Sequence, residues 1–186
     1  MKKTTAMQLT TMGLMTALMC VLAPLSIQLP GLVPISLGSF IVYLTVYIVG
    51  LEYAAVSNVV YILLGAFGLP VFSGYVGGLA KLTGPTGGYI IGFIAVTIVC
   101  GIALKVFKGN IVAFFAAMVV GTALLYLLGT LWFMHVMGTG LQASLTACVY
   151  PFIPFDLVKM VIVCILGPAV RIPLVKAGLL KSYKTN

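Results

Sequence analysis

Apolar residues dominate this chain, and they gather in stretches that prolines, glycines and a few polar residues separate. An apolar helix of roughly 20 residues is long enough to cross the hydrocarbon core of a bilayer. The pattern predicts an all-α membrane protein with six transmembrane helices in one bundle, over residues 7–25, 40–50, 53–69, 89–104, 111–131 and 156–172. We expect residues 1–186 to form this single membrane domain. In the last helix, Gly167-Pro168 is expected to introduce a kink and Pro173 to end the helix.

Three segments between the apolar stretches carry prolines and glycines that do not fit a continuous helix. They are residues 24–39, 71–88 and 135–155. Non-helical backbone at membrane depth must be buried in protein or line a cavity, because lipid offers it no hydrogen bonds. We therefore expect these segments to meet on the outer face and to form a ligand pocket. For residues 139–155 the pattern leaves a loop, a re-entrant helix and a tight helical cap as alternatives.

The segment 71–88 holds six glycines and one lysine, Lys81. Glycine lets the backbone approach another surface closely, so we expect this segment to belong to a binding surface. It is not a nucleotide phosphate loop, because the string GxxxxGK[ST] occurs nowhere in the chain. Gly84, Gly88 and Gly92 repeat every four residues and predict a helix edge that packs tightly on a neighbouring helix.

Composition and charge agree with a membrane protein. Hydrophobic residues make up 62% of the chain and charged residues only 6%, which excludes an ordinary soluble domain. The net charge of +8 does not indicate nucleic-acid binding, because the basic residues are scattered at the helix ends. With both termini in the cytoplasm, six helices place most basic residues on the inner side, as the positive-inside rule requires. These inner residues are Lys2, Lys3, Lys105, Lys108, Arg171, Lys176, Lys181 and Lys184.

A seventh crossing by residues 141–155 is rejected, because it would place the basic C-terminal tail outside. Lys81 and Lys159 remain on the outer side in the six-helix arrangement.

The chain has only two acidic residues, Glu52 and Asp156. Asp156 follows a double-proline turn and precedes Lys159 by three residues, which places both side chains on one face of a helix. Ionisable residues at membrane depth are costly and usually functional. We expect Asp156 at the start of the last helix, where the helix dipole favours an anion. A structural ion pair that caps this helix is the alternative to a ligand site.

A carboxylate in a dry pocket suits a ligand with N–H donors, and a lysine suits a carbonyl or carboxylate group. We therefore expect a compact, partly apolar ligand with an amide-like end and an anionic end. The charged candidates for contact are Asp156, Lys159 and Lys81. Hydroxyl groups could come from Tyr89, Thr86 and Ser73, and apolar walls from Phe72, Tyr75 and Tyr43.

The chain offers little for catalysis. Its single histidine, His135, has no Cys, Asp or Glu nearby, and its four cysteines show no CxxC spacing. We expect neither an enzyme nor a metal site nor a bound cofactor. Since no ATP-binding motif is present, ATP-driven work would require a partner. Gly13 and Ala17, four residues apart, form a small face that predicts either docking on such a partner or internal packing.

Three strings resemble the signatures of the BioY family: GLPVF at residues 68–72, GPTGGY at residues 84–89, and the pattern PFIPxDLxK at residues 151–159. The resemblance extends from Pro34-Ile35 to the C-terminal helix. BioY proteins are the biotin-specific substrate-binding (S) components of energy-coupling-factor (ECF) vitamin transporters in the bacterial cell membrane. The resemblance implies six helices, capture of biotin at the outer side, and docking on a transmembrane coupling subunit that carries two ATPases.

By position, the resemblance implies that Asp156 and Lys159 are polar contacts of biotin. It also implies that residues from Gly74 to Tyr89 supply loop and helix-start contacts, and that Gly13 and Ala17 form the docking face. An S component for thiamine or riboflavin, or a stand-alone ion-coupled carrier of a small solute, are the alternatives.

Overall fold

A computed structural model of the chain describes residues 6–27 and 33–183. Its elements follow one another in the order α1 (Ala6–Leu22), β1 (Ser26–Ile27), β2 (Ile35–Ser36), α2 (Gly38–Val49), α3 (Leu51–Ala66), α4 (Leu79–Thr83), α5 (Gly87–Val106), α6 (Ile111–Met137), α7 (Leu141–Cys148) and α8 (Phe152–Lys176). Each of the six predicted ranges overlaps one long helix, although most ends differ by a few residues. The predicted inner residues Lys2, Lys3 and Lys184 lie outside the described part of the chain.

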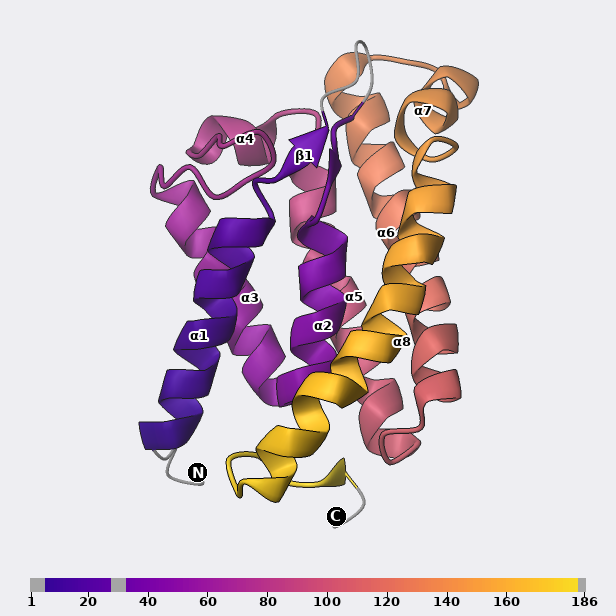
Figure 1. The fold of residues 1–186 in the computed structure, drawn as a ribbon. Coiled ribbons are helices and arrows are strands. Elements are labelled where there is room, and N and C mark those ends of the chain that lie inside the picture. The colour runs from indigo at the N-terminus through magenta and orange to yellow at the C-terminus, as the bar shows by residue number, and fades with distance from the viewer. Residues whose placement is uncertain (1–5, 28–32, 184–186) are drawn as a thin grey trace.

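The six long helices run alternately up and down and form one bundle (Figure 1). The start of α1 and the end of α8 lie at the same end of the bundle, called here the terminal end. At the opposite end, called the loop end, lie the antiparallel pair β1–β2, the short helix α4 and the helix α7. The predicted convergence of three irregular segments on one face is therefore seen at the loop end.

Within the described part of the chain, three helices are long and apolar enough to cross a membrane: α5 with 20 residues, α6 with 27 and α8 with 25. The apolar helices α1, α2 and α3 are shorter, with 17, 12 and 16 residues. Large apolar side chains such as Val120, Leu127 and Ile165 are exposed on the outside of the bundle. Water would make such a surface unfavourable, whereas lipid tails would not. These features indicate a membrane protein.

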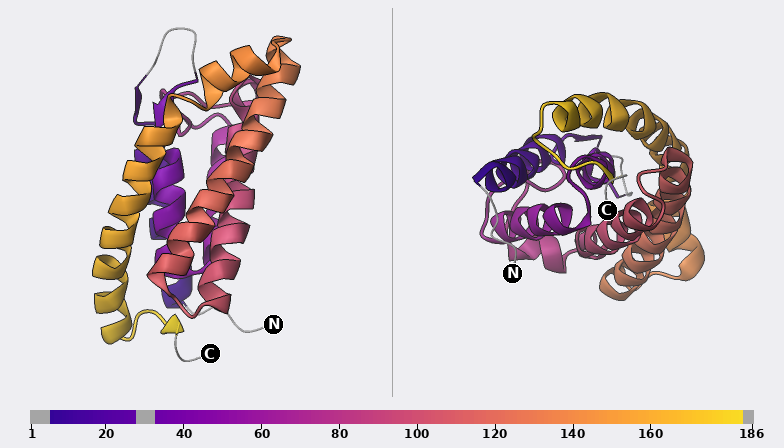
Figure 2. Two further views of the ribbon diagram at one scale, coloured as in Figure 1. Left: turned by 90° about the vertical axis from the view of Figure 1, so that its right-hand side faces the viewer. Right: turned by 90° about the horizontal axis from the view of Figure 1, so that it is seen from below.

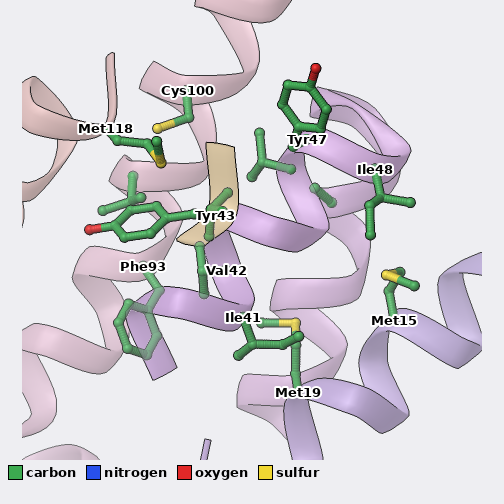
Figure 3. Packing of buried hydrophobic residues seen from close by; sticks show 14 of the residues in the cluster. Met15, Met19, Ile41, Val42, Tyr43, Tyr47, Ile48, Phe93, Cys100 and Met118 are labelled. Atoms are coloured by element: carbon green, nitrogen blue, oxygen red, sulfur yellow. The ribbon is translucent and has the colours of Figure 1, made fainter. Parts of the chain in front are cut away.

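Helix α2 forms the centre of the bundle, and ten of its twelve residues are buried. A helix that is apolar on all sides is stable when other helices surround it. Figure 3 shows Met15 and Met19 of α1 near one side of α2, and Cys100 and Met118 near Tyr43 on another. Because α2 is enclosed by protein, it does not need the length of a lipid-exposed span.

Helices α5 and α6 approach closely along the predicted glycine edge. A Cβ atom on Gly88 would lie 2.4 Å from Cβ of Trp132, and one on Gly92 would lie 2.7 Å from Cδ1 of Leu125. Larger residues at these two positions would push the helices apart. The predicted tight edge is thus confirmed at Gly88 and Gly92, whereas Gly84 precedes α5 and ends α4.

The ends of two helices differ from the prediction. Helix α8 begins at Phe152 rather than Asp156, because Pro154 lies in the first turn, where a missing N–H costs no helical bond. It continues through Pro168 and past Pro173 to Lys176, so the expected end at Pro173 is wrong. Membrane helices tolerate internal proline more readily than soluble ones do.

Helix α6 continues six residues past the predicted end at residue 131 and stops at Gly138, which adopts the left-handed conformation with φ of 64°. The end of this helix is therefore set by the glycine cap. Of the alternatives for residues 139–155, the structure contains a short helix, α7, followed by the first turn of α8.

At the terminal end, the segment after α8 turns back beneath the bundle and reaches the end of α2 (Figure 2, right). The buried Arg171 donates hydrogen bonds to the carbonyl oxygens of Tyr47, Ile48 and Lys181. Tyr183 donates a hydrogen bond of 2.9 Å to the Tyr47 carbonyl, and its ring lies 3.5 Å from the Arg171 guanidinium. The last carbonyls of a helix have no partners within it. Arg171 and Tyr183 supply those partners for α2.

We predict that Arg171→Met lowers the thermal unfolding midpoint of the detergent-solubilised protein. The change keeps much of the side-chain volume but removes all donors, and leaving buried carbonyls unpaired costs about 1–3 kcal/mol each. Lys176→Met, an exposed position on the same helix, is the control and should leave the midpoint nearly unchanged. Equal midpoints for Arg171→Met and the unmodified protein would contradict the capping role.

Candidate ligand-binding site

A cavity with about 590 Å³ of empty space, part of it open to solvent, lies toward the loop end of the bundle. Its walls come from α2, α3, α5, α6 and α8 and from the segments that precede α2 and α5. It is lined by Ala23, Val33, Pro34, Ser36, Gly38, Ser39, Tyr61, Ser73, Thr86, Tyr89, Ile90, Phe93, Leu125, Tyr126, Phe152, Asp156 and Lys159. Mostly apolar walls with a few convergent polar groups are the usual form of a small-molecule site.

Asp156 and Lys159 lie on the buried face of α8 and form an ion pair with 2.9 Å between Nζ and Oδ1. Their side chains are only 6% and 10% exposed. Asp156 is the fifth residue of α8, so the prediction that it stands at the helix start is wrong. The effect of the helix dipole falls off within the first turn. Direct hydrogen bonds must therefore stabilise this carboxylate.

Those hydrogen bonds come from two other helices. Ser39 of α2 donates to Oδ1 of Asp156 at 3.0 Å, and Tyr126 of α6 donates to Oδ2 at 2.6 Å. Lys159 Nζ donates to the Ser36 carbonyl at 2.7 Å and to the Ser39 hydroxyl at 3.2 Å, besides its bond to Asp156. A buried ion pair is tolerated when its remaining donors and acceptors are satisfied in this way.

Asp156 and Lys159 differ in how many of their hydrogen-bonding positions are already occupied within the protein. An ammonium has three N–H donors, and all three of Lys159 are used within the protein. A carboxylate has about four acceptor positions, and three of those of Asp156 are used. The position that no residue within 6–27 and 33–183 fills belongs to Oδ2. Asp156 can therefore accept a hydrogen bond from a ligand without losing a partner, whereas Lys159 would have to exchange one.

Three of the predicted hydroxyl residues, Ser73, Thr86 and Tyr89, line the same cavity. The Thr86 hydroxyl is buried and has no hydrogen-bond partner within residues 6–27 and 33–183. Burying a hydroxyl without a partner is unfavourable, so this group is available to a ligand. The Tyr89 hydroxyl already donates to the Cys148 carbonyl at 3.0 Å, which connects the start of α5 to α7.

The other predicted contact residues do not line the cavity. Lys81 lies on α4 and is half-buried, and this burial lowers the pKa of its ammonium group. Tyr75 is 61% exposed in the loop before α4. The backbone N–H of Gly74 donates to the Pro24 carbonyl at 3.0 Å and so connects that loop to the end of α1.

Phe72 and Tyr43 are fully buried in the core. The Phe72 ring packs edge-on against Tyr61, with 5.6 Å between the ring centroids, and it therefore supports the cavity wall from behind. Tyr43 lies one turn below Ser39 on α2, and its hydroxyl is 2.6 Å from the Thr122 hydroxyl.

The cavity residues that were not predicted from the sequence include Ser36, Ser39, Tyr61, Phe93 and Tyr126. Tyr126 did carry a signal, because it is a hydroxyl residue within an apolar helical stretch, and Ser39 belongs to the irregular segment 24–39 that was expected to help form the pocket. The proposed docking residues lie elsewhere: Gly13 and Ala17 are exposed on α1, and a Cβ atom on Gly13 would meet nothing within 4 Å.

Comparisons with known proteins agree on one family. The BioY family model matches residues 1–175. The biotin transporter BioY of Thermotoga maritima is 38% identical over 163 residues, which cover 86% of this chain and 93% of the relative. Biotin transporter BioY2 of Lactococcus lactis subsp. cremoris is 31% identical over 169 residues, which cover 91% and 92%.

Among solved structures, the S-component for biotin from an ECF-type ABC transporter is similar with a TM-score of 0.82. The two chains are 27% identical, and the match covers 88% of this chain and 90% of the other.

We predict that Lys159→Met strongly destabilises the protein, because it leaves the buried Asp156 charge without its counter-ion. Removing one partner of a buried ion pair costs about 3–5 kcal/mol, which should appear as a lower thermal unfolding midpoint. Adding Asp156→Asn to Lys159→Met should restore part of the loss.

The control for this prediction is Lys105→Met, which breaks the exposed pair with Glu52, 2.8 Å between Nζ and Oε1. Exposed pairs contribute about 0–1 kcal/mol, so the control should shift the midpoint little. If the two lysine variants were equally destabilised, burial of the Asp156–Lys159 pair would not be what makes it important.

Proposed function

This chain belongs to the BioY family, and from that membership and the cavity at the loop end we propose that it is the biotin-binding S component of an ECF-type transporter. The observation that carries this proposal is the buried Asp156 carboxylate, which lines the cavity and has one acceptor position that no described residue fills. The protein captures a vitamin and delivers it, and it is not an enzyme.

The chemistry of biotin suits the walls of the cavity. Its ureido ring presents two N–H donors and a carbonyl, and Asp156 can accept from such an N–H group. The Thr86 hydroxyl has no partner among the described residues and can bond the same polar ring. The rings of Tyr89, Phe93 and Tyr126 provide apolar surface for the thiophane ring. The carboxylate tail would point toward the open side of the cavity, with Lys81 of α4 proposed as its counter-ion.

We further propose that all six long helices cross the bacterial cell membrane, with both termini in the cytoplasm. Within the described ranges, Lys105, Lys108, Arg171, Lys176 and Lys181 belong to elements at the terminal end, which agrees with the positive-inside rule. The loop end would then face outward, and the cavity would receive biotin from outside the cell.

The transport cycle requires partners that this chain does not replace. We propose that a transmembrane coupling subunit with two ATPases provides the work, since the sequence contains no ATP-binding motif. Biotin is the transported ligand, and the proposal includes no cofactor and no nucleic acid. The exposed small face of Gly13 and Ala17 on α1 is proposed as the docking surface, because small residues let two helices approach closely in a membrane.

We predict that the purified protein binds labelled biotin, and that unlabelled biotin displaces it far better than thiamine or riboflavin does. Asp156→Asn should weaken binding at least about tenfold, because a hydrogen bond to a charged group contributes roughly 1.5–3 kcal/mol. Equilibrium binding in detergent measures both effects. Stronger competition by thiamine or riboflavin would contradict the substrate, and unchanged binding by Asp156→Asn would contradict the site.

We also predict that Gly13→Leu abolishes biotin uptake by cells that express the coupling proteins, while biotin binding to the purified variant is unchanged. A Cβ atom at this position would meet nothing within 4 Å, so a leucine side chain has room on the outside of α1, where it would separate α1 from a docked helix. Leu14→Phe adds bulk at a neighbouring exposed position and should preserve both uptake and binding. If Gly13→Leu lost binding together with uptake, the residue would serve the fold and not the docking surface.

A further inference from the structure

A second hollow, called here the crevice, lies between α6 and α8 and holds about 440 Å³ of empty space. One stripe of residues on each helix forms its walls. They are Val119, Thr122, Ala123 and Tyr126 on α6, and Ile153, Asp156, Leu157 and Met160 on α8. Both sets have the spacing i, i+3, i+4, i+7 of a single helix face. The crevice is mostly apolar, and α2 is visible between the ribbons of α6 and α8 (Figure 2, left).

The crevice lies at the level of the membrane core. Val119 is eight residues from the start of α6, and Tyr126 is eleven residues from its end. At 1.5 Å per residue these distances are about 12 Å and about 16 Å. Lipid headgroups lie near the helix ends, so the open side of the crevice faces acyl chains.

Two residues line both the ligand cavity and the crevice: Asp156 and Tyr126. The Tyr126 hydroxyl crosses from α6 to α8 and donates to Oδ2 of Asp156 at 2.6 Å. Hydroxyl–carboxylate bonds of this length are among the stronger hydrogen bonds in proteins. This single bond therefore stands where the two hollow spaces meet.

The bond also determines the direction of the carboxylate. Ser39 and Lys159 bind Oδ1, and Tyr126 binds Oδ2, so a turn of the planar carboxylate about its bond to Cβ would take both oxygens away from their donors. A turn that pointed Oδ2 into the crevice would place a charged oxygen against hydrocarbon, where no donor is available. Tyr126 opposes such a turn, because it gives Oδ2 a donor at the boundary between the two hollows.

We propose that Tyr126 is a positioning residue of the ligand site. Its hydroxyl holds Oδ2 of Asp156 toward the cavity, and its side chain closes the cavity against the lipid-facing crevice. The proposal rests on the proposed function for its ligand, an N–H donor such as the ureido group of biotin. A carboxylate that is already oriented binds such a group without the cost of ordering it first. Tyr126 acts through Asp156 and need not touch the ligand polar atoms itself.

The first test is equilibrium binding of labelled biotin to Tyr126→Phe, which keeps the ring and removes the hydroxyl. We expect binding about tenfold weaker than that of the unmodified protein. Tyr183→Phe removes a hydroxyl with a similar hydrogen bond at the terminal end, and it should bind biotin as the unmodified protein does. Unchanged binding by Tyr126→Phe would overturn the positioning role.

A double-mutant cycle separates positioning from a general structural effect. If Tyr126 acts through Asp156, then adding Tyr126→Phe to Asp156→Asn should weaken binding no further than Asp156→Asn alone. A merely structural role would instead lower affinity by the same factor in both backgrounds. Additive effects of the two substitutions would therefore overturn the proposal.

The second test does not depend on the ligand. A tryptophan at position 152, introduced as Phe152→Trp in the Trp132→Phe background, reports from the cavity wall, since Trp132 is the chain's only tryptophan. In vesicles of phospholipids with brominated acyl chains, Tyr126→Ala should increase quenching of this reporter, because the cavity and the crevice would join. Equal quenching with and without Tyr126→Ala would show that Tyr126 does not close the cavity.

The two proposals can fail separately. If the unmodified protein bound another vitamin in place of biotin, the proposed substrate would be wrong, and the Tyr126 cycle would be repeated with that vitamin. The quenching result would decide the closing role of Tyr126 in either case.

Discussion

The site depends on one constraint: two opposite charges inside an apolar bundle must find most of their partners within the protein. Asp156 and Lys159 are almost fully buried, so α2 contributes Ser39, the segment before it contributes the Ser36 carbonyl, and α6 contributes Tyr126. Low dielectric strengthens each of these bonds and makes each missing one costly. The same bonds hold α2, α6 and α8 together at the loop end, so the ligand site and the packing of three helices have a common cause.

Much of the fold could be predicted because apolar length and interruptions are local properties of the sequence. The ranges of all six long helices and the gathering of irregular segments at one end followed from them. The ends of α8 could not be predicted, because a proline such as Pro173 is tolerated only when neighbouring helices and the membrane permit it. The last carbonyl of the short helix α7 accepts a hydrogen bond from Tyr89 at the start of α5, a contact that no local pattern reveals.

The candidate site was predictable where chemistry stood out from its surroundings. Asp156 and Lys159 were conspicuous as charges in an apolar stretch, and Thr86 and Tyr89 belong to the glycine-rich string that begins α5. Ser39 and Tyr126 were not singled out, because the role of one hydroxyl in an apolar helix depends on the residue that packs opposite it, and the sequence does not show that residue. Tyr43 was expected to line the pocket, but it lies one helical turn from Ser39 and belongs to the core, where its hydroxyl meets Thr122. A position along a helix cannot be assigned to cavity or core from the sequence to within one turn.

The capping of α2 by Arg171 and Tyr183 has a consequence for how the protein is made. These residues lie 124 and 136 positions after Tyr47, whose carbonyl they bind. Helix α2 is synthesised early, yet the partners for its last carbonyls follow 124 and 136 residues later. The end of α2 therefore obtains its full set of hydrogen bonds only after Tyr183 has been translated and has left the ribosome.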